Sequence, residues 1–456
     1  MRLQSAFLAL SLLTTLTSAH PQEGGAIPAP PTGGSTDPSY SCPSSCTPPS
    51  CQCASTAIPG GLSKDKTPMF VTLTYDDSVQ VELFETIMAV HNRTQNSNGC
   101  DLPGTFFVST QYTDFWLVQR TYGLGSEVAC HTINHFDLRN MSAAAVTAEI
   151  DGCRKAINAF SGVPASKLTG FRHPFLSFSP TSMEAVQKAG FEYDSSIVLD
   201  PNTQAFWPHT LDYGMPYNPQ PCTNCPPGPQ WKLPGLWEIP MYALLDKDGK
   251  VWASMDPIIN PQLNDYDKAL DNLKKTFDVH YEKKLPMGLY QHISQLVAWV
   301  AFGDDKRKKQ DLLTAFFAYT QQKSDVYFVT NQQLLAWIKK PVPTDQMSTF
   351  LPCILPATDK SNKEICDGID NNGDGAVDEG LVLSCQITPT SNTRSCFGCP
   401  AVNPNVSNPV PDHGNALKAI PADGCPNLGS WDPAAGSCLD LKRPQAVAKS
   451  SNGTQG

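Results

Sequence analysis

The chain has 456 residues, of which 40% are hydrophobic, enough to bury one large core and to leave a second, smaller region. This composition excludes a chain that is disordered throughout. The formal net charge of −10 argues against nucleic acid or an anionic membrane as the main partner, because phosphate groups are bound by clustered cations.

The first predicted element is a secretory signal peptide over residues 1–19. Arg2 precedes an apolar run over 6–13, and small residues suited to cleavage end at Ala19. The run is too short to span a bilayer as a mature helix, and the polar end QAVAKSSNGTQG excludes a lipid-anchor signal. We therefore expect a secreted, extracellular protein without a membrane anchor.

The next segment, residues 20–60, is rich in Pro, Gly and Ser and contains four closely spaced cysteines. The whole chain has 16 cysteines, an even number that fits an oxidising compartment. We therefore interpret the segment as tied by disulfides, with a zinc site as the alternative. Four N-x-S/T sequons are compatible with a glycosylated surface: Asn92, Asn140, Asn405 and Asn452.

Residues 61–353 are predicted to form one α/β domain. Apolar runs of strand length recur: FVTLTY, GTFFVS, SEVAC, LTGFR, LWEIPM, MGLYQ and DVYFVT. Helical patterns such as VELFETIMAVHN and SAAAVTAEIDGCRKAINAF separate several of them, which predicts a parallel sheet covered by helices. A barrel and a doubly wound sheet both satisfy this alternation. No G-x-G-x-x-G follows a strand, so the nucleotide-binding form of the doubly wound sheet loses support.

Polar side chains follow several of these strands at the point where each ends. Asp76 and Asp77 follow FVTLTY, and His131 follows SEVAC. Arg172 ends LTGF, and His292 ends MGLYQ. The C-terminal ends of barrel strands converge on one mouth, where active sites are built. We therefore predict a distorted, incomplete (β/α) barrel with its active site at that end.

The motif HTINH indicates a metal site. His131 and His135 are four residues apart, so a helical turn would bring both imidazoles to one side. With Asp77 they form a set of two histidines and one carboxylate, which holds a divalent ion and leaves a position for water. For the motif alone, two ordinary surface histidines are the alternative. The same set also holds iron in oxygenases, so it does not name the reaction.

The second carboxylate helps to separate these reactions. Adjacent residues of a strand point to opposite faces, so Asp76 and Asp77 should have different roles. One carboxylate as a metal ligand and the other as a proton acceptor beside the metal is a hydrolase arrangement. Two adjacent acids do not satisfy the glycosidase requirement for carboxylates on opposite sides of a sugar linkage.

Two further motifs add a cation and a proton donor. Arg172 in FRHPF would orient a carboxylate and favour its ionised form; a structural surface Arg is the alternative. His292 alone would be a structural residue, but opposite a metal site it becomes a proton donor to a leaving group. Several aromatic residues could stack on sugar rings or lie in the core: Phe175, Trp207, Trp231 and Trp237.

After about residue 340, Pro, Asn and Cys replace the periodic pattern, and we predict a cysteine-rich tail over 354–456. Seven cysteines lie from residue 353 onward, and this odd number implies a bridge to the barrel or a free thiol. Within CDGIDNNGDGAVDEG, positions one, three and five of a calcium loop are occupied by Asp370, Asn372 and Asp374.

The calcium loop, predicted over 367–380, departs from the usual pattern at its end. Position twelve is Leu381 instead of Glu, so Asp378 or Glu379 would have to supply the missing acid. A polar turn tied by disulfides is the alternative to Ca²⁺ binding.

Considered together, the motifs resemble those of a known family. TYDDS, HTINH, RHPF, YDSS with the later LWEIP, and GLYQH occur in the order of the five motifs of the polysaccharide deacetylases, carbohydrate esterase family four. The chain is similar above all to animal chitin deacetylases, through CxxxxCxC before IPGGL, SNGC before GTFFVS, WPHTLDY and DVYFVTNQQLLAWIKKPVP. The resemblance covers roughly residues 42–353, and several motifs in order are more specific than any one.

The resemblance implies a barrel with fewer than eight full repeats and a zinc ion or another divalent transition metal. Its implied reaction is removal of N-acetyl groups from a β-1,4-linked N-acetylglucosamine polymer. By position, Asp76 matches the family's catalytic base, and Arg172 matches the residue that positions that base. The positions of the metal ligands are matched by Asp77, His131 and His135.

Three more positions carry roles by resemblance. Phe175 matches the residue whose backbone N–H stabilises the oxyanion, Trp237 the aromatic residue that lines the site, and His292 the general acid. Ser78 stands where many relatives have Gly or Ala, which removes no catalytic group. There is no separate cysteine-framed chitin-binding module, which argues against tight anchoring to crystalline chitin.

We therefore predict a secreted, metal-dependent hydrolase that removes N-acetyl groups from chitin or chito-oligosaccharides and releases acetate. Two alternatives remain at this point. One is a catalytically inactive chitin-binding matrix protein on the same fold, although the complete set of catalytic residues argues against it. The other is an esterase that removes O-acetyl groups from a different polysaccharide.

Overall fold

The computed structural model describes residues 37–219, 222, 225–256, 265–292, 294, 309–353, 363–388 and 391–412, and the backbone of 430–432 and 437–439. The predicted signal peptide and the sequon at Asn452 lie outside the described residues. No helix in the described part is both long and apolar enough to cross a membrane.

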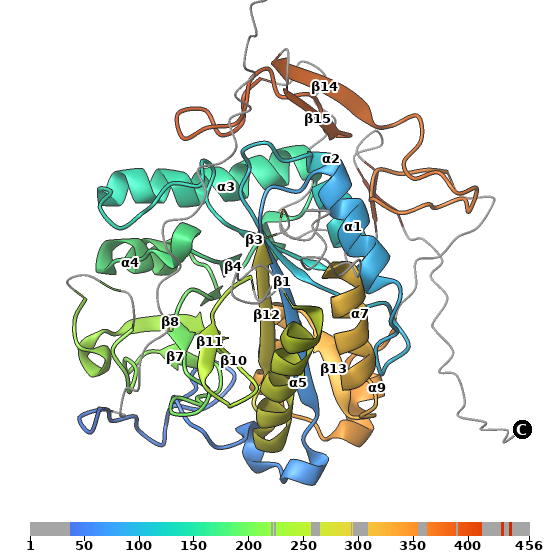
Figure 1. The fold of residues 1–456 in the computed structure, drawn as a ribbon. Helices are drawn as coiled ribbons and strands as arrows, with labels where there is room; N and C mark the ends of the chain where they lie inside the picture. The colour runs from blue at the N-terminus through green and yellow to red at the C-terminus, as the bar shows by residue number, and fades with distance from the viewer. Residues whose placement is uncertain are drawn as a thin grey trace, which may run out of the picture.

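A nine-stranded sheet forms the centre of the molecule, surrounded by helices (Figure 1). Its strands are β1 (Met69–Asp77), β2 (Thr105–Val108), β3 (Glu127–Cys130), β4 (Gly170–Phe171), β5 (Tyr193–Asp194), β7 (His209–Leu211), β8 (Leu233–Glu238), β12 (Met287–His292) and β13 (Val326–Val329). Their order is β12-β1-β2-β3-β4-β5-β8-β7, and β13 also pairs with β1. The pairings are parallel except for β7 with β8.

Helices connect most of these strands, as a parallel sheet requires. They are α1 (Val81–His91), α2 (Phe115–Gly123), α3 (Ala143–Ser161), α4 (Pro180–Lys188), α5 (Tyr266–Lys283), α7 (Lys309–Thr320), α8 (Asn331–Lys339) and α9 (Met347–Phe350). Short 3-10 helices are η1 (Pro59–Gly61), η2 (Lys64–Lys66), η3 (Ala165–Lys167), η4 (Pro174–Leu176), η5 (Gly228–Gln230) and η7 (Thr344–Gln346).

The sheet is curled but not closed. Among the described residues no ladder joins β7 to β12. The gap is bridged by a short parallel pair, β6 (Val198–Leu199) and β9 (Met241–Tyr242). The Tyr242 N–H donates to Tyr290 Oη on β12 at 2.9 Å, and the Asp256 N–H donates to the Tyr290 carbonyl oxygen at 2.9 Å. The predicted distorted (β/α) barrel is therefore confirmed.

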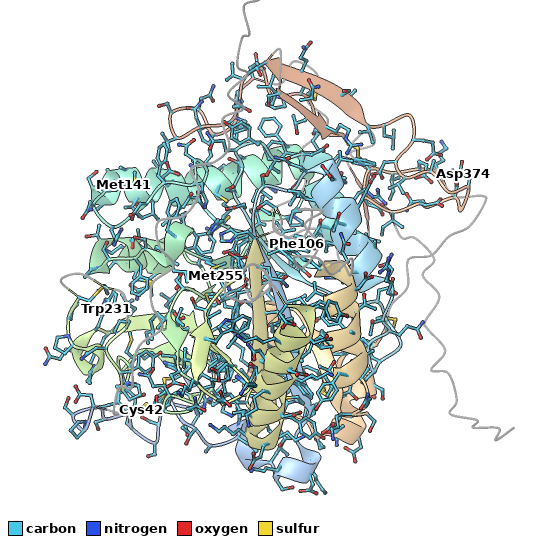
Figure 2. The ribbon with its side chains drawn as sticks, in the orientation of Figure 1. Cys42, Phe106, Met141, Trp231, Met255 and Asp374 are labelled. Carbon is cyan, nitrogen blue, oxygen red and sulfur yellow. A yellow bond between two sulfur atoms is a disulfide. The ribbon has the colours of Figure 1, made fainter. Side chains whose placement is uncertain are left out.

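The core lies on both faces of the central strands. All residues of β1 from Met69 to Asp76 are buried. This continuous burial is expected for a parallel strand covered on both sides. Phe106 on β2, labelled near the centre of Figure 2, is fully buried as well. Asp77, the last residue of β1, is the first one to reach partial exposure.

Six disulfides connect the described cysteines: Cys42–Cys53, Cys46–Cys51, Cys100–Cys353, Cys222–Cys225, Cys366–Cys396 and Cys385–Cys399. The first two confirm that the N-terminal segment is tied by disulfides. Cys100–Cys353 joins the barrel to the cysteines that begin at residue 353, which is one of the two alternatives left open by their odd number. Cys130 and Cys153 are free and buried. The side chains of Cys425 and Cys438 lie outside the described residues.

The tail contributes a hairpin of β14 (Leu383–Thr388) and β15 (Ser391–Ser395), drawn over α2 in Figure 1. Thr393 Oγ1 donates to the Thr113 carbonyl oxygen at 3.0 Å, and the Phe115 N–H donates to Thr393 Oγ1 at 3.2 Å. The remaining antiparallel pairs are β10 (Leu244–Leu245) with β11 (Val251–Ala253), and β16 (Ser430–Asp432) with β17 (Ser437–Leu439). The tail therefore packs on the barrel at the start of α2.

Candidate active site

The polar residues at the strand ends lie together, as the sequence predicts. In the sheet register Asp76 on β1 pairs with His292 on β12. The His131 N–H, one residue past β3, donates to the Val108 carbonyl oxygen at the end of β2. The Arg172 N–H, one residue past β4, donates to the Cys130 carbonyl oxygen at the end of β3. Successive strands therefore present their last residues at one edge of the sheet.

Asp76 and Arg172 form a buried ion pair. Arg172 Nη1 donates to Asp76 Oδ1 at 2.7 Å and to Thr74 Oγ1 at 2.8 Å. Arg172 is fully buried, Asp76 is 1% exposed, and the guanidinium carbon lies 4.0 Å from the centre of the Phe107 ring. Because both charges are desolvated, each depends on the other for compensation.

Further contacts fix Arg172 and adjust the pKa of Asp76. Arg172 Nε donates to the Ser195 carbonyl oxygen at 2.7 Å, and its Nη2 donates to Ser195 Oγ at 3.1 Å. Burial raises the pKa of Asp76 above its ordinary value, although the positive charges of Arg172 and His292 oppose the shift. A carboxylate with a raised pKa is a stronger base than an ordinary Asp.

Asp77, His131 and His135 form a compact set of potential metal ligands. One ligand atom from each of the three lies within 4.8 Å of the other two. Asp77 Oδ1 is 3.0 Å from His135 Nε2 and 3.7 Å from His131 Nε2. The two other such groups in the described part include disulfide-bonded cysteines, which have no thiolate to offer: Cys42, Cys46 and Cys53, and Cys366, Asp378 and Cys396.

The donor atoms of this set fit a divalent transition metal. His131 Nδ1 is 2.8 Å from the Arg172 carbonyl oxygen, which only accepts, so Nδ1 carries the proton and Nε2 is left with a lone pair. Asp77 Oδ1 and His135 Nε2 are buried and face each other at 3.0 Å, with no further hydrogen-bond partner among the described residues. Such atoms are costly to bury unless something binds them.

The electrostatics of the set agree with this fit. Burial and the neighbouring His135 lower the pKa of His131 well below its ordinary value, so its imidazole is neutral. Burial would raise the pKa of Asp77, but the contact with His135 and the positive charge of His292 outweigh burial and lower it. An ionised carboxylate and a neutral imidazole are the forms that bind metal.

Backbone strain marks the same loops. Several residues other than glycine at the strand ends have a left-handed backbone, including Asp77 (φ 84°), Thr132 (φ 67°), His135 (φ 57°), Phe175 (φ 59°) and Asp256 (φ 51°). Each such residue costs of the order of 1 kcal/mol or more, and the cost persists where the surrounding structure fixes the conformation. The chain therefore holds these side chains in directions that a regular strand or turn would not give.

His292 has a partner that sequence reasoning missed. His292 Nδ1 is 2.6 Å from Asp256 Oδ2, and the His292 N–H donates to Asp256 Oδ1 at 2.8 Å. Burial would lower the pKa of His292, but Asp256, with smaller contributions from Asp77 and Asp76, raises it to about 10. His292 is therefore protonated near neutral pH. The only signal for Asp256 in the sequence is an acid shortly after the strand-like VWAS, which many loops share.

Phe175 lies beside the metal-ligand set. Its ring centre is 4.7 Å from that of His135, edge to face, and 44% of the residue is exposed. Among the described residues none accepts a hydrogen bond from the Phe175 backbone N–H. That N–H is therefore free to donate a hydrogen bond, and its role toward an oxyanion stays a prediction.

The structure does not place Trp237 at the mouth of the barrel, in contrast to our prediction. Trp237 is 2% exposed, and Lys339 Nζ on α8 lies 5.4 Å from the centre of its ring. Its neighbour Glu238 turns inward, where its pKa is raised well above normal by burial and by Asp194. Because adjacent strand residues point to opposite faces, Trp237 faces the helix layer outside the barrel.

The predicted calcium residues do not all share one surface. Asp370 accepts hydrogen bonds from the Gly375 and Gly373 N–H groups, and Asn372 Nδ2 donates to Glu379 Oε1 at 2.8 Å. Asp374 lies at the edge of the molecule (Figure 2).

Asp378 is buried instead, and it accepts from Trp116 Nε1 at 2.7 Å and from the Gly368 N–H. Burial raises its pKa to about 7. Asp378 therefore links the tail to α2. Of the two candidates for the acid missing at position twelve, only Glu379 is left.

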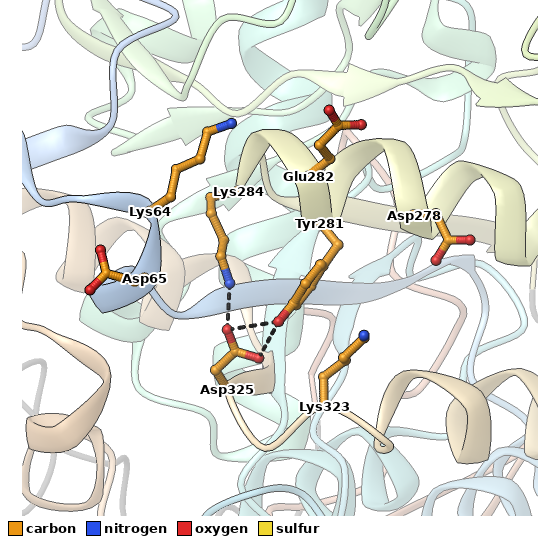
Figure 3. A pocket seen from close by; sticks show the side chains of 8 residues that line it. All are labelled: Lys64, Asp65, Asp278, Tyr281, Glu282, Lys284, Lys323 and Asp325. Atoms are coloured by element: carbon orange, nitrogen blue, oxygen red, sulfur yellow. Dashed lines mark hydrogen bonds and ion pairs between the residues drawn. The ribbon is translucent and has the colours of Figure 1, made fainter.

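A separate hollow of about 540 Å³ lies near the start of β1, and Figure 3 shows the side chains that line it. It is lined by basic and acidic side chains and by one tyrosine: Lys64, Asp65, Asp278, Tyr281, Glu282, Lys284, Lys323 and Asp325. Asp325 accepts from Tyr281 Oη and from Lys284 Nζ, and its carbonyl oxygen accepts from the Met69 N–H at the start of β1. The Lys284–Asp325 ion pair and the Tyr281 hydrogen bond therefore hold the start of β1 and the start of β13 against α5.

Comparison with known proteins identifies the family. Residues 63–193, which include Asp76, Asp77, His131, His135 and Arg172, match the family described as polysaccharide deacetylase. The chain is 31% identical to chitin deacetylase 8 of Bombyx mori over 311 residues, which cover 66% of this chain and 78% of that protein. The chain belongs to the polysaccharide deacetylase family. The resemblance stated from the motifs is thereby confirmed.

Two further proteins are similar to this chain. Chitin deacetylase 1 of Bombyx mori is 29% identical over 397 residues, 81% of this chain and 68% of that protein. A solved CE4 domain of a multidomain xylanase from the hindgut metagenome of Trinervitermes trinervoides is 16% identical, with a TM-score of 0.35, and covers 59% of this chain and 90% of that one. The two curated relatives support a deacetylase, and hence a hydrolase.

Proposed function

We propose that this protein is a secreted, metal-dependent deacetylase that removes N-acetyl groups from chitin or chito-oligosaccharides. The observation that carries the proposal is the convergence of three units at one sheet edge. These units are the Asp76–Arg172 pair, the Asp77, His131 and His135 set, and the His292–Asp256 pair. The chitin deacetylases of Bombyx mori support N-acetylglucosamine polymers as the substrate class.

The metal proposal is zinc or another divalent transition metal, held by Asp77, His131 and His135. The neutral imidazole of His131 and the ionised carboxylate of Asp77, both described above, are donors that such ions prefer. When bound, the ion supplies Lewis acidity toward the acetamide carbonyl and toward water. Secretion is supported by the disulfides, which persist in oxidising compartments.

Each residue of the site has one chemical task in this proposal. Asp76 accepts a proton from the water that attacks the acetamide carbonyl carbon, while Arg172 holds the carboxylate in place. The Phe175 N–H donates to the oxygen that becomes negatively charged. His292 donates its proton to the amide nitrogen as the C–N bond breaks, and Asp256 keeps His292 oriented and protonated. Water and acetamide are thus converted into acetate and an amine.

The second metal proposal concerns the tail. Ca²⁺ binding at the loop 367–380 would use Asp370, Asn372, Asp374 and Glu379, because Asp378 is engaged with Trp116. Isothermal titration with CaCl₂ tests this proposal. Binding heat that wild type shows and the Asp370→Asn, Asp374→Asn double variant lacks supports the proposal. Equal heat for wild type and the double variant contradicts it.

The decisive experiment is acetate release from defined substrates. The purified chain is incubated with chito-oligosaccharides and with acetylated xylan, with and without a chelator, and the products are analysed by mass spectrometry. We expect acetate from the chito-oligosaccharides only, and loss of activity with the chelator. Acetate from xylan alone would indicate an O-acetyl esterase, and acetate from neither polymer would leave a chitin-binding protein.

A further inference from the structure

We propose that Tyr112, Phe136 and Phe175 form an aromatic rim that binds sugar rings next to the unit being deacetylated. The inference rests on the proposed function and extends it by assigning binding residues for a longer sugar chain. The residues follow three neighbouring strands: Tyr112 lies after β2, Phe136 after β3 and Phe175 after β4.

The exposure of these side chains is the first observation. Eight large hydrophobic residues are exposed in the described part: Val81, Tyr112, Leu124, Phe136, Phe175, Leu383, Val402 and Val406. The aromatic residues among them are the three of the rim, with exposed fractions of 50%, 52% and 44% in chain order. All three lie on loops at the C-terminal ends of the strands, where the site residues lie. Exposed aromatic residues on neighbouring loops at one end of a sheet are typical of a binding surface.

The loop that carries Tyr112 is fastened to both metal-ligand loops. The Ser109 N–H donates to the Asp77 carbonyl oxygen at 3.3 Å, and the Val79 N–H donates to Thr113 Oγ1 at 3.2 Å. Thr110 Oγ1 donates to the carbonyl oxygen of Ile133, between the two histidine ligands, at 2.8 Å. Tyr112 thus sits on a short stretch fixed on both sides to the ligand loops.

The other two rim residues are coupled to His135 and to each other. Phe136 directly follows His135, and the Phe175 ring is 4.7 Å from the His135 ring. Ser177 Oγ donates to Asp137 Oδ1 at 2.7 Å, which ties the loop of Phe175 to the loop of Phe136. Tyr112 (φ 62°) and Phe175 (φ 59°) also have left-handed backbones. These conformations cost energy, and they persist because the surrounding contacts hold them.

A saccharide is the occupant that this arrangement fits. A pyranose ring has apolar C–H faces and polar edges, so it covers an aromatic ring while its hydroxyl groups stay in water. The rim adjoins the metal-ligand set, and a protein partner seated there would block access to Asp77 and His135. In a β-1,4-linked chain the neighbouring sugar units extend across the rim when one acetamide group is at the site.

The test compares substrate lengths in rim variants of the full chain. kcat and KM for acetate release are measured on the disaccharide and the pentasaccharide of N-acetylglucosamine, for wild type, Tyr112→Ala and Phe136→Ala. We expect kcat/KM on the pentasaccharide to fall about tenfold in each variant, mainly through KM, with a smaller fall on the disaccharide. Leu124→Ala, 47% exposed and outside the rim, is the matched control with unchanged activity. Phe136→Tyr should restore the pentasaccharide KM.

The outcomes separate this inference from the proposed function. If wild type releases acetate but kcat/KM of the rim variants falls equally on the disaccharide and the pentasaccharide, or does not fall, the proposed rim is contradicted. If wild type releases no acetate from any chito-oligosaccharide, the proposed function fails and the rim is judged by binding alone. Isothermal titration with the pentasaccharide then decides: weaker binding by Tyr112→Ala and Phe136→Ala supports the rim, and binding equal to wild type overturns it.

Discussion

Asp76 and Asp77 are neighbours in the chain, yet their carboxylates meet different partners. Asp76 keeps the extended strand and lies inside the barrel against Arg172. At Asp77 the backbone turns to φ 84°, which directs the second carboxylate toward His131 and His135. One left-handed residue at the end of β1 therefore separates the proposed base from the proposed metal ligand.

The first prediction tests this separation of roles. Asp76→Asn should keep the metal but lose most of its turnover, by about 100-fold or more, because an amide cannot accept the proton. His131→Ala should lose the metal as well, since it removes one of three ligands. Metal content by mass spectrometry and kcat for acetate release distinguish the variants. An Asp76→Asn protein without metal would mean that the two acids have exchanged roles.

The second prediction concerns pH and the His292–Asp256 pair. His292 acts when it is protonated, so activity is present below its pKa and is lost as the pH rises through that value. Asp256 raises this pKa to about 10. Asp256→Asn removes the negative charge and should move the alkaline limit of kcat to lower pH by about one unit or more. The pH profile measures the shift; an alkaline limit that stays in place would show that another group sets it.

At the scale of elements, the tail and α2 depend on one another. Asp114 caps α2 by accepting from the Leu117 N–H, and Arg394 Nε on β15 donates to Asp114 Oδ2 at 2.7 Å. The Thr393 hydroxyl group bonds the backbone on both sides of Asp114. This helix start follows Tyr112 by two residues. The hairpin therefore holds the end of the loop that carries part of the aromatic rim.

The third prediction removes this support. Thr393→Val keeps the shape of the side chain but leaves the Thr113 carbonyl oxygen and the Phe115 N–H without their partner. The free energy of unfolding should fall by about 1–3 kcal/mol, measured by denaturant titration. Asn392→Ala on the same strand, where the side chain is exposed, is the matched control and should change it little. Equal stability of the two variants would argue against a stabilising role for the Thr393 hydrogen bonds.

At the scale of the whole molecule, the Cys100–Cys353 disulfide links two parts of the α/β domain that lie far apart in the sequence. Its cysteines are 253 residues apart, so the bridge encloses nearly the whole α/β domain. Cys46–Cys51 encloses only a short turn with a separation of 5. A cross-link restricts the unfolded chain more strongly when the loop that it closes is longer.

The fourth prediction compares these two bridges. Replacing both cysteines of Cys100–Cys353 by Ser should lower the free energy of unfolding by about 5 kcal/mol, and the same change at Cys46–Cys51 by about 2 kcal/mol, in the loop-entropy account. Denaturant titration of the two double variants checks the order. A larger effect at the short bridge would mean that local packing, and not loop length, dominates.

Much of the barrel and the site could be predicted because the signals are local. Strand patterns alternate with helical ones, and Asp76, His131 and Arg172 stand at strand ends, where a parallel sheet gathers them. The partner of His292 could not be found, because Asp256 lies on a loop that only the folded chain brings to β12. The sequence also could not decide which face Trp237 takes, since both faces of a parallel strand are buried.

The two free thiols among the described residues, Cys130 and Cys153, lie next to His131, the proposed metal ligand. Cys130 precedes it in the chain, and Cys153 Sγ on α3 donates to the Val108 carbonyl oxygen at 3.4 Å; both residues are fully buried. In the oxidising compartment proposed for this protein, burial would shield these thiols from oxidants. The rate at which an alkylating reagent modifies Cys130 and Cys153 therefore measures how often the structure around His131 opens, with no engineered label.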